Sequence, residues 1–368
     1  MKQRVATPVP ATAQRAVDVR DFGARGDGVT NDTPAVAADT ALGYPRQDRS
    51  SLLEESYIIP APPAQPSAGG TPAPEWRSLY PFASQYLKLA DGCSYHYLDE
   101  GRGEPVILLH GNPSWSFLFR DLIRELRTQF QVLAPDHLGC GLSDKPQDYP
   151  YRLENHIANL EALVIGKLNL PRFSLVLHDW GGAIGMGLAT RYPERVANLV
   201  VMNTAAFLLP RCPWRIRACR VPGFGALAVR GFNGFARAAL RMAVAKPERL
   251  TPAIRAGYLA PYDSWRNRIA TLRFVQDIPL SPRHPSRQTL IGIQEHLPVL
   301  DAKPMLICWG ERDFCFGEPF LQAWISRFPR AIVRRFPEAG HYLLEDAGEY
   351  ICPLVREFLC GQGRVRTG

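Results

Sequence analysis

The stretch LVLHDWGG, Leu175–Gly182, decides the fold. An apolar run ends in a polar residue, Asp179, and small residues then open a helical pattern. This order predicts a strand, a sharp turn and a helix, and the turn holds one side chain at the end of the strand near backbone N–H groups. Gly181 and Gly182 are expected to let the helix pack close to the strand. We therefore predict that Asp179 is presented at the edge of a sheet as a nucleophile.

A carboxylate at such a turn limits the chemistry of the site. Asp179 is ionised near neutral pH, so a histidine cannot activate it by removing a proton. It can attack an electrophilic carbon directly and form a covalent ester. The aspartate of an isolated D-x-G-G sequence more often caps a helix, so this interpretation depends on partner residues elsewhere in the chain.

Short apolar runs alternate with helical spacing on both sides of this stretch, as in α/β folds. Residues 85–89 and 94–98 flank Asp91-Gly92 and predict a hairpin. Continuous apolar runs predict buried parallel strands at 105–110, 131–136, 173–178, 198–203, 305–309 and 331–336. Helices are expected at 115–127, 153–168, 182–192, 319–328 and 350–359. The chain is thus predicted to form a mostly parallel sheet with helices on both faces.

The alternating pattern is interrupted once. Residues 79–205 and 301–362 carry it and form the predicted core. Residues 206–300 are rich in arginine, alanine and aromatic side chains, and they are expected to be a helical cap inserted after the sixth strand. Such a cap would lie above the carboxyl ends of the strands, where ligands bind in these sheets.

Residues 1–78 are expected to lie outside this domain, which should fold and act without them. Within them, 17–42 resembles the opening segment of pectate-lyase-like β-helix proteins, but none of the repeats that would bury its apolar face follow. Residues 60–74 read as a proline-rich linker. Residues 363–368 are expected to be a short tail.

Polar residues that follow other predicted strands could complete a site. HGNPSW, His110–Trp115, follows the first buried strand. The side-chain amide of Asn112 and the indole N–H of Trp180 can both donate hydrogen bonds, and beside Asp179 they would hold a developing negative charge. Asparagine before proline is also common in turns.

WGERD and AGHY follow two later strands and place Asp313 and His341 after Asp179 in the order nucleophile, acid, histidine. His341 is expected to be the base, with Asp313 fixing its orientation. Glu311 is the rival acid, but it lies two residues earlier and is expected to point elsewhere. His178 precedes the nucleophile and is expected to serve as packing or as hydrogen-bonded support.

Composition argues against several classes of protein. The 368 residues are 46% hydrophobic, enough for a large core. No run of about 18 uncharged apolar residues predicts a spanning helix, and the N-terminus lacks the apolar segment of a secretory signal. Eight cysteines without a C-x-x-C pair, several of them in apolar runs, indicate reduced, buried thiols and a cytoplasmic protein.

The formal net charge of +8 is unevenly spread, because residues 211–295 contain 15 basic and 4 acidic residues. No zinc motif, aromatic RNA platform or basic helix with a zipper accompanies this charge, which disfavours nucleic-acid binding. The basic surface is expected to be a solvated face, or else to meet an acidic partner or an anionic membrane.

From about Tyr80 to Leu359 the chain resembles the haloalkane dehalogenase group of the α/β-hydrolase fold. HGNPSW, PDHLGCGLSDKP, HDWGG, WGERD and AGHY match in this order. The resemblance implies a nucleophile, a base, an acid and two leaving-group donors, without a metal or organic cofactor. These roles fall on Asp179, His341, Asp313, Asn112 and Trp180.

The cap sequences NTAAF at 203–207 and LAPYDSWRNRIATLRFVQDIPL at 259–280 look like those of the β-lactone decarboxylases of bacterial long-chain olefin biosynthesis. This resemblance implies a lyase that converts a cis-dialkyl β-lactone with long alkyl chains into a cis-alkene and CO2. Asp179 would attack the strained ring at the carbonyl or at the alkyl carbon. Protein partners are also implied, namely a lactone-forming synthetase and a reductase.

The five site residues alone do not separate this function from haloalkane dehalogenation, in which Asp179 displaces halide and His341 activates water. Epoxide hydrolysis would need two cap tyrosines aimed at the epoxide oxygen, for which Tyr258 and Tyr262 are the candidates. The complete set of residues disfavours a binding protein without activity. Apolar residues within 213–245 could line a tunnel for two alkyl chains, form ordinary cap packing, or belong to an amphipathic helix on a membrane.

Overall fold

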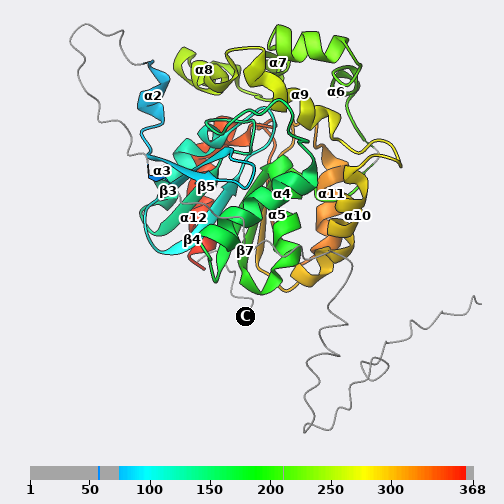
Figure 1. The fold of residues 1–368 in the computed structure, drawn as a ribbon. Coiled ribbons are helices and arrows are strands. Elements are labelled where there is room, and N and C mark those ends of the chain that lie inside the picture. The colour runs from blue at the N-terminus through cyan, green and yellow to red at the C-terminus, as the bar shows by residue number, and fades with distance from the viewer. Residues whose placement is uncertain (1–56, 59–73, 210, 362–368) are drawn as a thin grey trace, which may run out of the picture. The chain divides into compact units, whose positions relative to one another are not determined.

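The structure, a computed structural model, describes three stretches of the chain, residues 57–58, 74–209 and 211–361 (Figure 1). They belong to one compact unit, Leu52–Gly368. The segment 17–42, the linker expected at 60–74 except for its last residue, and the tail 363–368 lie outside the described residues. None of the helices in the described stretches combines the length and the apolar composition needed to cross a bilayer.

A nine-stranded sheet runs through the described part of the domain. In chain order its strands are β1 (Tyr57–Ile58), β2 (Ser84–Lys88), β3 (Ser94–Glu100), β4 (Glu104–Leu109), β5 (Phe130–Pro135), β6 (Phe173–Asp179), β7 (Val196–Thr204), β8 (Met305–Gly310) and β9 (Ile332–Phe336). Their spatial order is β1-β2-β3-β5-β4-β6-β7-β8-β9. The strands from β5 to β9 in this order are parallel, and β1 to β3 continue the sheet in antiparallel pairs. The predicted hairpin and the mostly parallel sheet are confirmed.

Helices cover both faces of the sheet because the strands alternate their apolar side chains between two layers. Ile107 and Leu109 of β4 face the layer that holds α4 (Leu153–Glu161), α5 (Trp180–Arg191), α10 (Ser286–His296) and α11 (Glu318–Arg327). Val106 and Leu108 face the layer that holds α3 (Arg120–Leu126) and α12 (Leu343–Leu359). Short turns of helix complete the core, namely η2 (Ser116–Phe119), η3 (Ala162–Lys167), η4 (Pro193–Arg195) and η9 (Leu297–Leu300).

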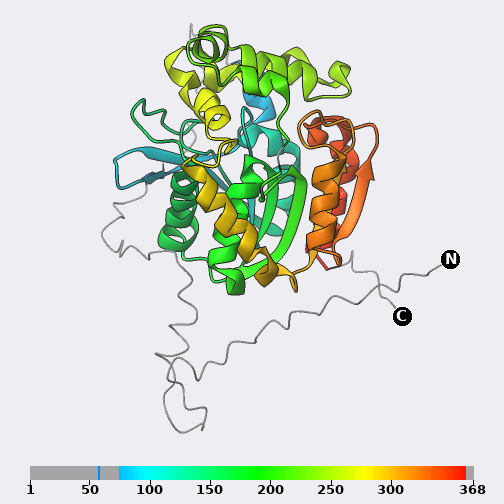
Figure 2. The same ribbon diagram turned by 90° about the vertical axis from the view of Figure 1, so that its right-hand side faces the viewer.

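The cap follows β7 and lies above the carboxyl ends of the strands (Figure 2). Its elements are α6 (Trp214–Ala218), η5 (Ala226–Gly231), α7 (Gly234–Met242), η6 (Pro247–Arg249), α8 (Pro252–Leu259), η7 (Ala260–Tyr262), η8 (Arg266–Arg268) and α9 (Ile269–Gln276). The boundary expected at residue 300 needs correction. Helix α10 packs on α4 and α5, with Leu290 and Ile293 in the core layer (Figure 1). The cap therefore ends before Ser286, and α10 belongs to the core.

The expected start of the domain at Leu79 is also too late. Trp76 belongs to the short helix α2 (Trp76–Leu79) and is only 8% exposed. Its ring meets the ring of Trp115 edge-on, with centroids 5.9 Å apart. Because α2 packs on the core and β1 pairs with β2, a boundary at residue 78 would cut through packed structure.

All eight cysteines are free thiols, in agreement with the absence of a C-x-x-C pair. Cys140, Cys308 and Cys352 are buried, whereas Cys360 is exposed and the other four are half-buried. The expectation of buried thiols therefore holds for only part of the set.

Candidate active site

Asp179 stands at the junction of β6 and α5, as the elbow pattern predicts. Its φ of 52° and ψ of −125° lie in a region that costs a non-glycine residue about 1–3 kcal/mol. The neighbouring packing holds this conformation. A Cβ at Gly181 would collide with the backbone oxygen of Leu109, one at Gly182 would collide with the side chain of Thr204, and the Thr204 hydroxyl donates to the carbonyl oxygen of Asp179.

Backbone N–H groups hold the carboxylate of Asp179. The N–H of Asn112 donates to Oδ1 at 2.7 Å, and the N–H of Trp180 also stabilises the charge. Gly111 leaves room for this approach, because a Cβ there would collide with the carboxylate. Burial raises the pKa of Asp179, and His341 and the two N–H groups offset this only in part. These donors could also stabilise an oxyanion on an ester of Asp179.

The side chain of His341 lies between two carboxylates. Its Nε2 is 3.6 Å from Oδ2 of Asp179, and its Nδ1 is 2.7 Å from Oδ2 of Asp313. Burial opposes the imidazolium, but the carboxylates of Asp313 and Asp179 outweigh it and raise the pKa of His341. Burial also opposes the charge of Asp313, but His341 and backbone N–H groups lower the pKa of that carboxyl. The three side chains predicted from separate motifs thus form one connected group.

Asn203 supports this group and was not among the predicted site residues. Its Nδ2 donates to Oδ2 of Asp313 at 2.9 Å and to the carbonyl oxygen of Gly310 at 2.9 Å, and its Oδ1 accepts the N–H of Gly310. The amide therefore fixes the acid against the end of β8. Its place at the end of β7, in the NTAAF sequence, was the available signal.

The contacts of His178 and Glu311 agree with the expectation that neither is the acid or the base. The Nε2 of His178 lies 2.8 Å from the carbonyl oxygen of His341, and the two rings pack with centroids 4.6 Å apart. Burial lowers the pKa of His178 to about 3, which keeps this ring neutral as a support. Glu311 is exposed and pairs with Arg335 at 2.9 Å, so Asp313 is the carboxylate that contacts His341.

Asn112 and Trp180 both line the cavity that contains Asp179. One hydrogen of the Asn112 amide is used, since Nδ2 donates to the carbonyl oxygen of Thr271 in the cap at 3.1 Å. The second is not engaged by any described residue. The ring of Trp180 packs against Phe274 at 5.3 Å, and its indole N–H has no acceptor among the described residues. Both groups are therefore free to donate to a ligand.

The cavity above Asp179 is mostly apolar. Its volume is about 170 Å³, and it opens to solvent. The core contributes Leu153, Ala183, Phe207, Leu290 and Phe316, and the cap contributes Leu208, Ile216, Phe235, Ala239, Val275 and Ile278. Exposed members of the lining, Arg211, Leu280 and Phe314, mark its opening. Of the large apolar side chains expected to line a tunnel within 213–245, Ile216 and Phe235 line the cavity, whereas the others do not, namely Trp214, Phe224, Leu227, Phe232, Leu240 and Met242.

The first turn of α12 joins the loop of His341 to the cap. This turn begins at Leu343, and a non-helical residue, Ala347, separates it from the part of α12 that contains the helix predicted at 350–359. The buried carboxylate of Asp346 accepts the N–H groups of Gly340, Ala245 and Lys246 at 2.7, 2.9 and 2.8 Å. Glu345 binds Arg120 through two hydrogen bonds and accepts from the Tyr258 hydroxyl at 2.5 Å. Sequence reasoning missed these residues, which position the loop rather than react.

The two cap tyrosines do not point at the nucleophile. Tyr258 donates to Glu345, and the hydroxyl of Tyr262 donates to the carbonyl oxygen of Ser114 at 3.3 Å. Neither side chain lines the cavity, which disfavours epoxide hydrolysis.

Within the described stretches, no group of three or more histidine, cysteine, aspartate or glutamate side chains could hold a metal ion.

The chain is similar to known enzymes over most of its length. Residues 104–348 match the family profile of the alpha/beta hydrolase fold. A cis-3-alkyl-4-alkyloxetan-2-one decarboxylase of Shewanella oneidensis is 48% identical over 69% of this chain and 81% of that protein. An enzyme of the same name from Xanthomonas campestris pv. campestris is 41% identical over 68% of this chain and 87% of that protein. Haloalkane dehalogenase 2 of Mycobacterium bovis is 34% identical over 67% and 82%.

Solved structures agree with this placement. The crystal structure of a putative ancestral haloalkane dehalogenase covers 74% of this chain and 97% of that one, with a TM-score of 0.68 and 28% identity. A haloalkane dehalogenase from Agrobacterium tumefaciens C58 covers 74% and 94%, with a TM-score of 0.67 and 26% identity. The fold and the resemblance drawn from the motifs are thereby confirmed. The chain belongs to the alpha/beta hydrolase fold family and, within it, to the haloalkane dehalogenase-like enzymes that include the cis-3-alkyl-4-alkyloxetan-2-one decarboxylases.

Proposed function

We propose that the chain converts cis-dialkyl β-lactones into cis-alkenes and CO2, with Asp179 as the nucleophile. The observation that carries this choice is the 48% and 41% identity to two enzymes named for that lactone, against 34% for a dehalogenase. The cavity agrees with it. Its lining is mostly apolar and comes from both the core and the cap, which suits the two alkyl chains of such a lactone.

In the first step of the proposed reaction, Asp179 opens the ring. One carboxylate oxygen bonds to the ring carbon that carries the ring oxygen, and that carbon–oxygen bond breaks. Its electron pair stays on the departing carboxylate, to which the amide of Asn112 and the indole of Trp180 donate hydrogen bonds. We propose attack at this alkyl carbon because the step needs no proton and produces an alkyl ester of aspartate.

In the second step, the ring-opened intermediate loses CO2. The bond between its carboxylate carbon and the neighbouring carbon breaks, the electron pair forms the double bond, and the carboxylate of Asp179 leaves. Inversion in the first step followed by anti elimination keeps both alkyl groups on one side and gives the cis-alkene. The sum is lactone to alkene and CO2, without water or an external proton.

His341 and Asp313 have an electrostatic role in this scheme. Because the two carboxylates raise the pKa of His341, the ring is poised to be an imidazolium that holds Asp179 in place. It would also stabilise the aspartate as it departs in the second step. Asp313, fixed by Asn203, keeps Nε2 directed at Asp179.

Haloalkane dehalogenation is the second candidate, favoured by the likeness to dehalogenase structures. Asp179 would then displace halide held by Asn112 and Trp180. His341 would act as the base that activates water on the ester. This mechanism uses the same five side chains, so only the substrate and the fate of the ester distinguish the two.

The remaining assignments are proposals of the same kind. A β-lactone is a reactive intermediate, so the chain is proposed to act in the cytoplasm beside the lactone-forming synthetase and the reductase. The core at 79–205 and 301–362 would supply the reacting groups. The cap, expected at 206–300 and ending before Ser286 in the structure, would supply much of the alkyl-binding lining.

The test is to give the purified protein a synthetic cis-dialkyl β-lactone and, separately, 1-bromobutane. Alkene and CO2 from the lactone, in equal amounts, are the expected products. Bromide release without alkene would reject the decarboxylase proposal in favour of dehalogenation. Hydrolysis of the lactone to a hydroxy acid would reject the second step.

A further inference from the structure

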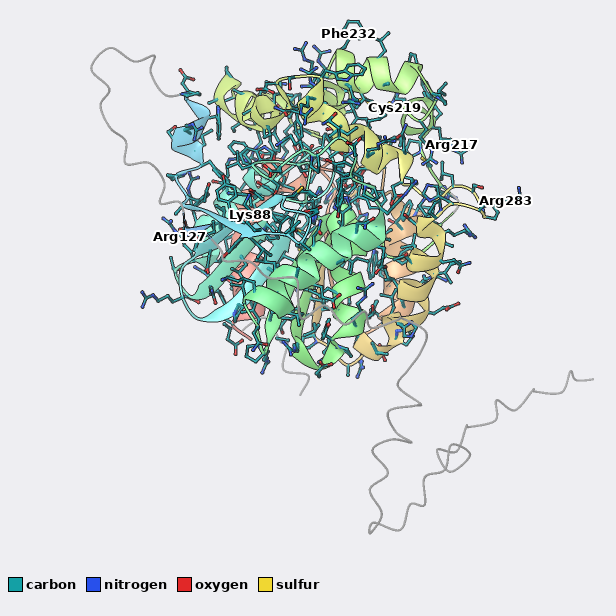
Figure 3. The ribbon with its side chains drawn as sticks, viewed as in Figure 1. Lys88, Arg127, Arg217, Cys219, Phe232 and Arg283 are labelled. Carbon is teal, nitrogen blue, oxygen red and sulfur yellow. The ribbon has the colours of Figure 1, made fainter. Side chains whose placement is uncertain are left out.

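The outer face of the cap exposes large apolar side chains. Trp214, Phe224, Leu227, Phe232 and Trp265, which we call the outer cap surface, are between 47% and 71% exposed. The side chains of Leu227 and Trp265 both lie next to Gly231, and Phe232 follows at the outer edge of the cap (Figure 3). Single exposed apolar residues are ordinary, but a group of this size indicates an interaction surface.

The charge around this surface is predominantly positive. Residues 211–247 contain eight basic residues and no acidic residue. The guanidinium of Arg215 lies 5.3 Å from the ring centre of Trp214, and that of Arg230 lies 4.7 Å from that of Trp265. Arg237 is exposed on the amphipathic helix α7. The surface thus offers aromatic rings beside cations, and the one exposed carboxylate near Trp265, that of Asp263, offsets only a small part of this charge.

The positive charge distinguishes between two possible partners of this surface, a second copy of the chain and an anionic bilayer. A symmetric dimer through the outer cap surface would place each patch against its own copy, and arginines would face arginines. An anionic layer would neutralise the same cations. Aromatic side chains flanked by arginine are typical of protein segments that lie in the interface of a bilayer. The position of Phe232 at the outer edge suits insertion between headgroups (Figure 3).

The opening of the cavity lies beside this surface. Arg211, Cys212, Pro213 and Ile216 line the cavity, and they are continuous in sequence with Trp214 and Arg215. Exposed Leu280 marks the opening on the cap side. A ligand that enters here therefore passes next to the outer cap surface.

We propose that the outer cap surface binds anionic lipid bilayers peripherally, with its aromatic rings among the headgroups and its arginines on lipid phosphates. Each cation near an anionic surface strengthens such binding about fivefold at low ionic strength. The consequence is delivery of a two-chain apolar substrate from the bilayer into the cavity, and this consequence rests on the proposed function. Binding to the bilayer does not rest on it.

The test is flotation of the full chain with phosphatidylcholine vesicles, with and without phosphatidylglycerol. The unmodified protein should float with anionic vesicles at low salt and not with neutral ones. The combined variant Trp214→Ser, Phe224→Ser, Phe232→Ser should lower the partition coefficient at least tenfold. Arg215→Gln, Arg237→Gln, Arg241→Gln should lower it on the order of 100-fold. None of these residues lines the cavity.

Two controls make the outcome decisive. Arg102→Gln with Arg172→Gln removes exposed cations away from the cap and should change binding far less. Lactone turnover in detergent should be retained by both cap variants, which separates vesicle binding from the proposed reaction. Failure of the unmodified chain to bind anionic vesicles would overturn the proposal. So would cap variants that bind normally, or that instead convert an oligomer into a monomer by light scattering.

Discussion

The Nε2 of His341 lies 3.6 Å from Oδ2 of Asp179. At this distance the imidazole can stabilise the carboxylate electrostatically, and there is space for a small movement of either side chain when a ligand binds. The opposite ring nitrogen is fixed at 2.7 Å by Asp313, so the ring cannot turn away. Decarboxylation and dehalogenation use this arrangement differently, because only dehalogenation needs a water molecule to attack the ester of Asp179.

Turnover in water enriched in oxygen-18 distinguishes decarboxylation from hydrolysis of the aspartyl ester. Hydrolysis of an ester at its carboxyl carbon transfers an oxygen atom from water to Asp179, whereas the two-step decarboxylation returns the original carboxylate. After many turnovers of the lactone, we expect the peptide that contains Asp179 to keep its normal mass by mass spectrometry. Uptake of label during lactone turnover would show ester hydrolysis and reject the two-step route.

Asp346→Ala should damage the position of His341. The substitution leaves the N–H groups of Gly340, Ala245 and Lys246 without their buried acceptor, and each such loss costs about 1–3 kcal/mol. We expect the free energy of unfolding in urea to fall by about 3 kcal/mol or more, and turnover to fall with it.

The matched control is Glu349→Gln, one turn later on α12. Glu349 forms an exposed ion pair with Arg249 at 2.7 Å, and such pairs contribute about 1 kcal/mol or less. The control should therefore be close to the unmodified protein in both measurements. Equal losses in the two variants would show that the anchoring of the loop by Asp346 has no special effect.

His156 should make the protein sensitive to acid. Its ring is 1% exposed and stacks on Phe274 at 4.4 Å, and neither nitrogen has a hydrogen-bond partner among the described residues. Burial lowers its pKa to about 3, against about 6.5 in an unfolded chain. The unfolded state therefore takes up the proton first as the pH falls, and stability is lost between about pH 6.5 and pH 3.

His156→Phe removes this proton uptake and keeps an aromatic ring against Phe274. Between pH 7 and pH 5, the unmodified protein should lose about 2 kcal/mol more unfolding free energy than the variant. Urea titrations at the two pH values measure this difference. The same loss in both proteins would mean that His156 is not held neutral in the folded state.

Trp76→Ala tests where the packed domain begins. Loss of a buried tryptophan against Trp115 should cost about 3 kcal/mol, and deletion of residues 1–78 should cost at least as much. Trp214→Ala is the matched control, because Trp214 is 71% exposed and its loss should change stability by about 0.5 kcal/mol or less. If Trp76→Ala is as mild as the control, the domain begins at Leu79 after all.

Local sequence patterns were sufficient for the fold and for predicting that the proposed site residues lie together. The strand, turn and helix around Asp179 are close in sequence, and parallel strands bring Asp313 and His341 to the same edge of the sheet. What the patterns could not supply depends on approach between distant segments. The N–H of Asn112 reaches Asp179 across 67 positions, and Asn203 reaches Asp313 across 110.

The errors at the domain boundaries have a similar cause. Helix α10 has the apolar spacing of any amphipathic helix, and only its packing on α4 and α5 assigns it to the core. Trp76 is an isolated aromatic residue beside a proline-rich segment, and only its contact with Trp115 shows that it is buried. The amphipathic pattern identifies which face is buried, and the partner of that face is set by the tertiary fold.

The rate of alkene formation by Asp179→Asn, compared with Asp277→Asn, tests the nucleophile most directly. Asp277 is a second buried carboxylate that lines the same cavity and pairs with Arg152. We expect Asp179→Asn to lose on the order of 10⁴-fold or more in the rate of alkene and CO2 release from a cis-dialkyl β-lactone. Asp277→Asn should stay within about tenfold of the unmodified protein, a loss too small for a nucleophile. Alkene formation by Asp179→Asn at the unmodified rate would contradict the assignment of Asp179 as the nucleophile.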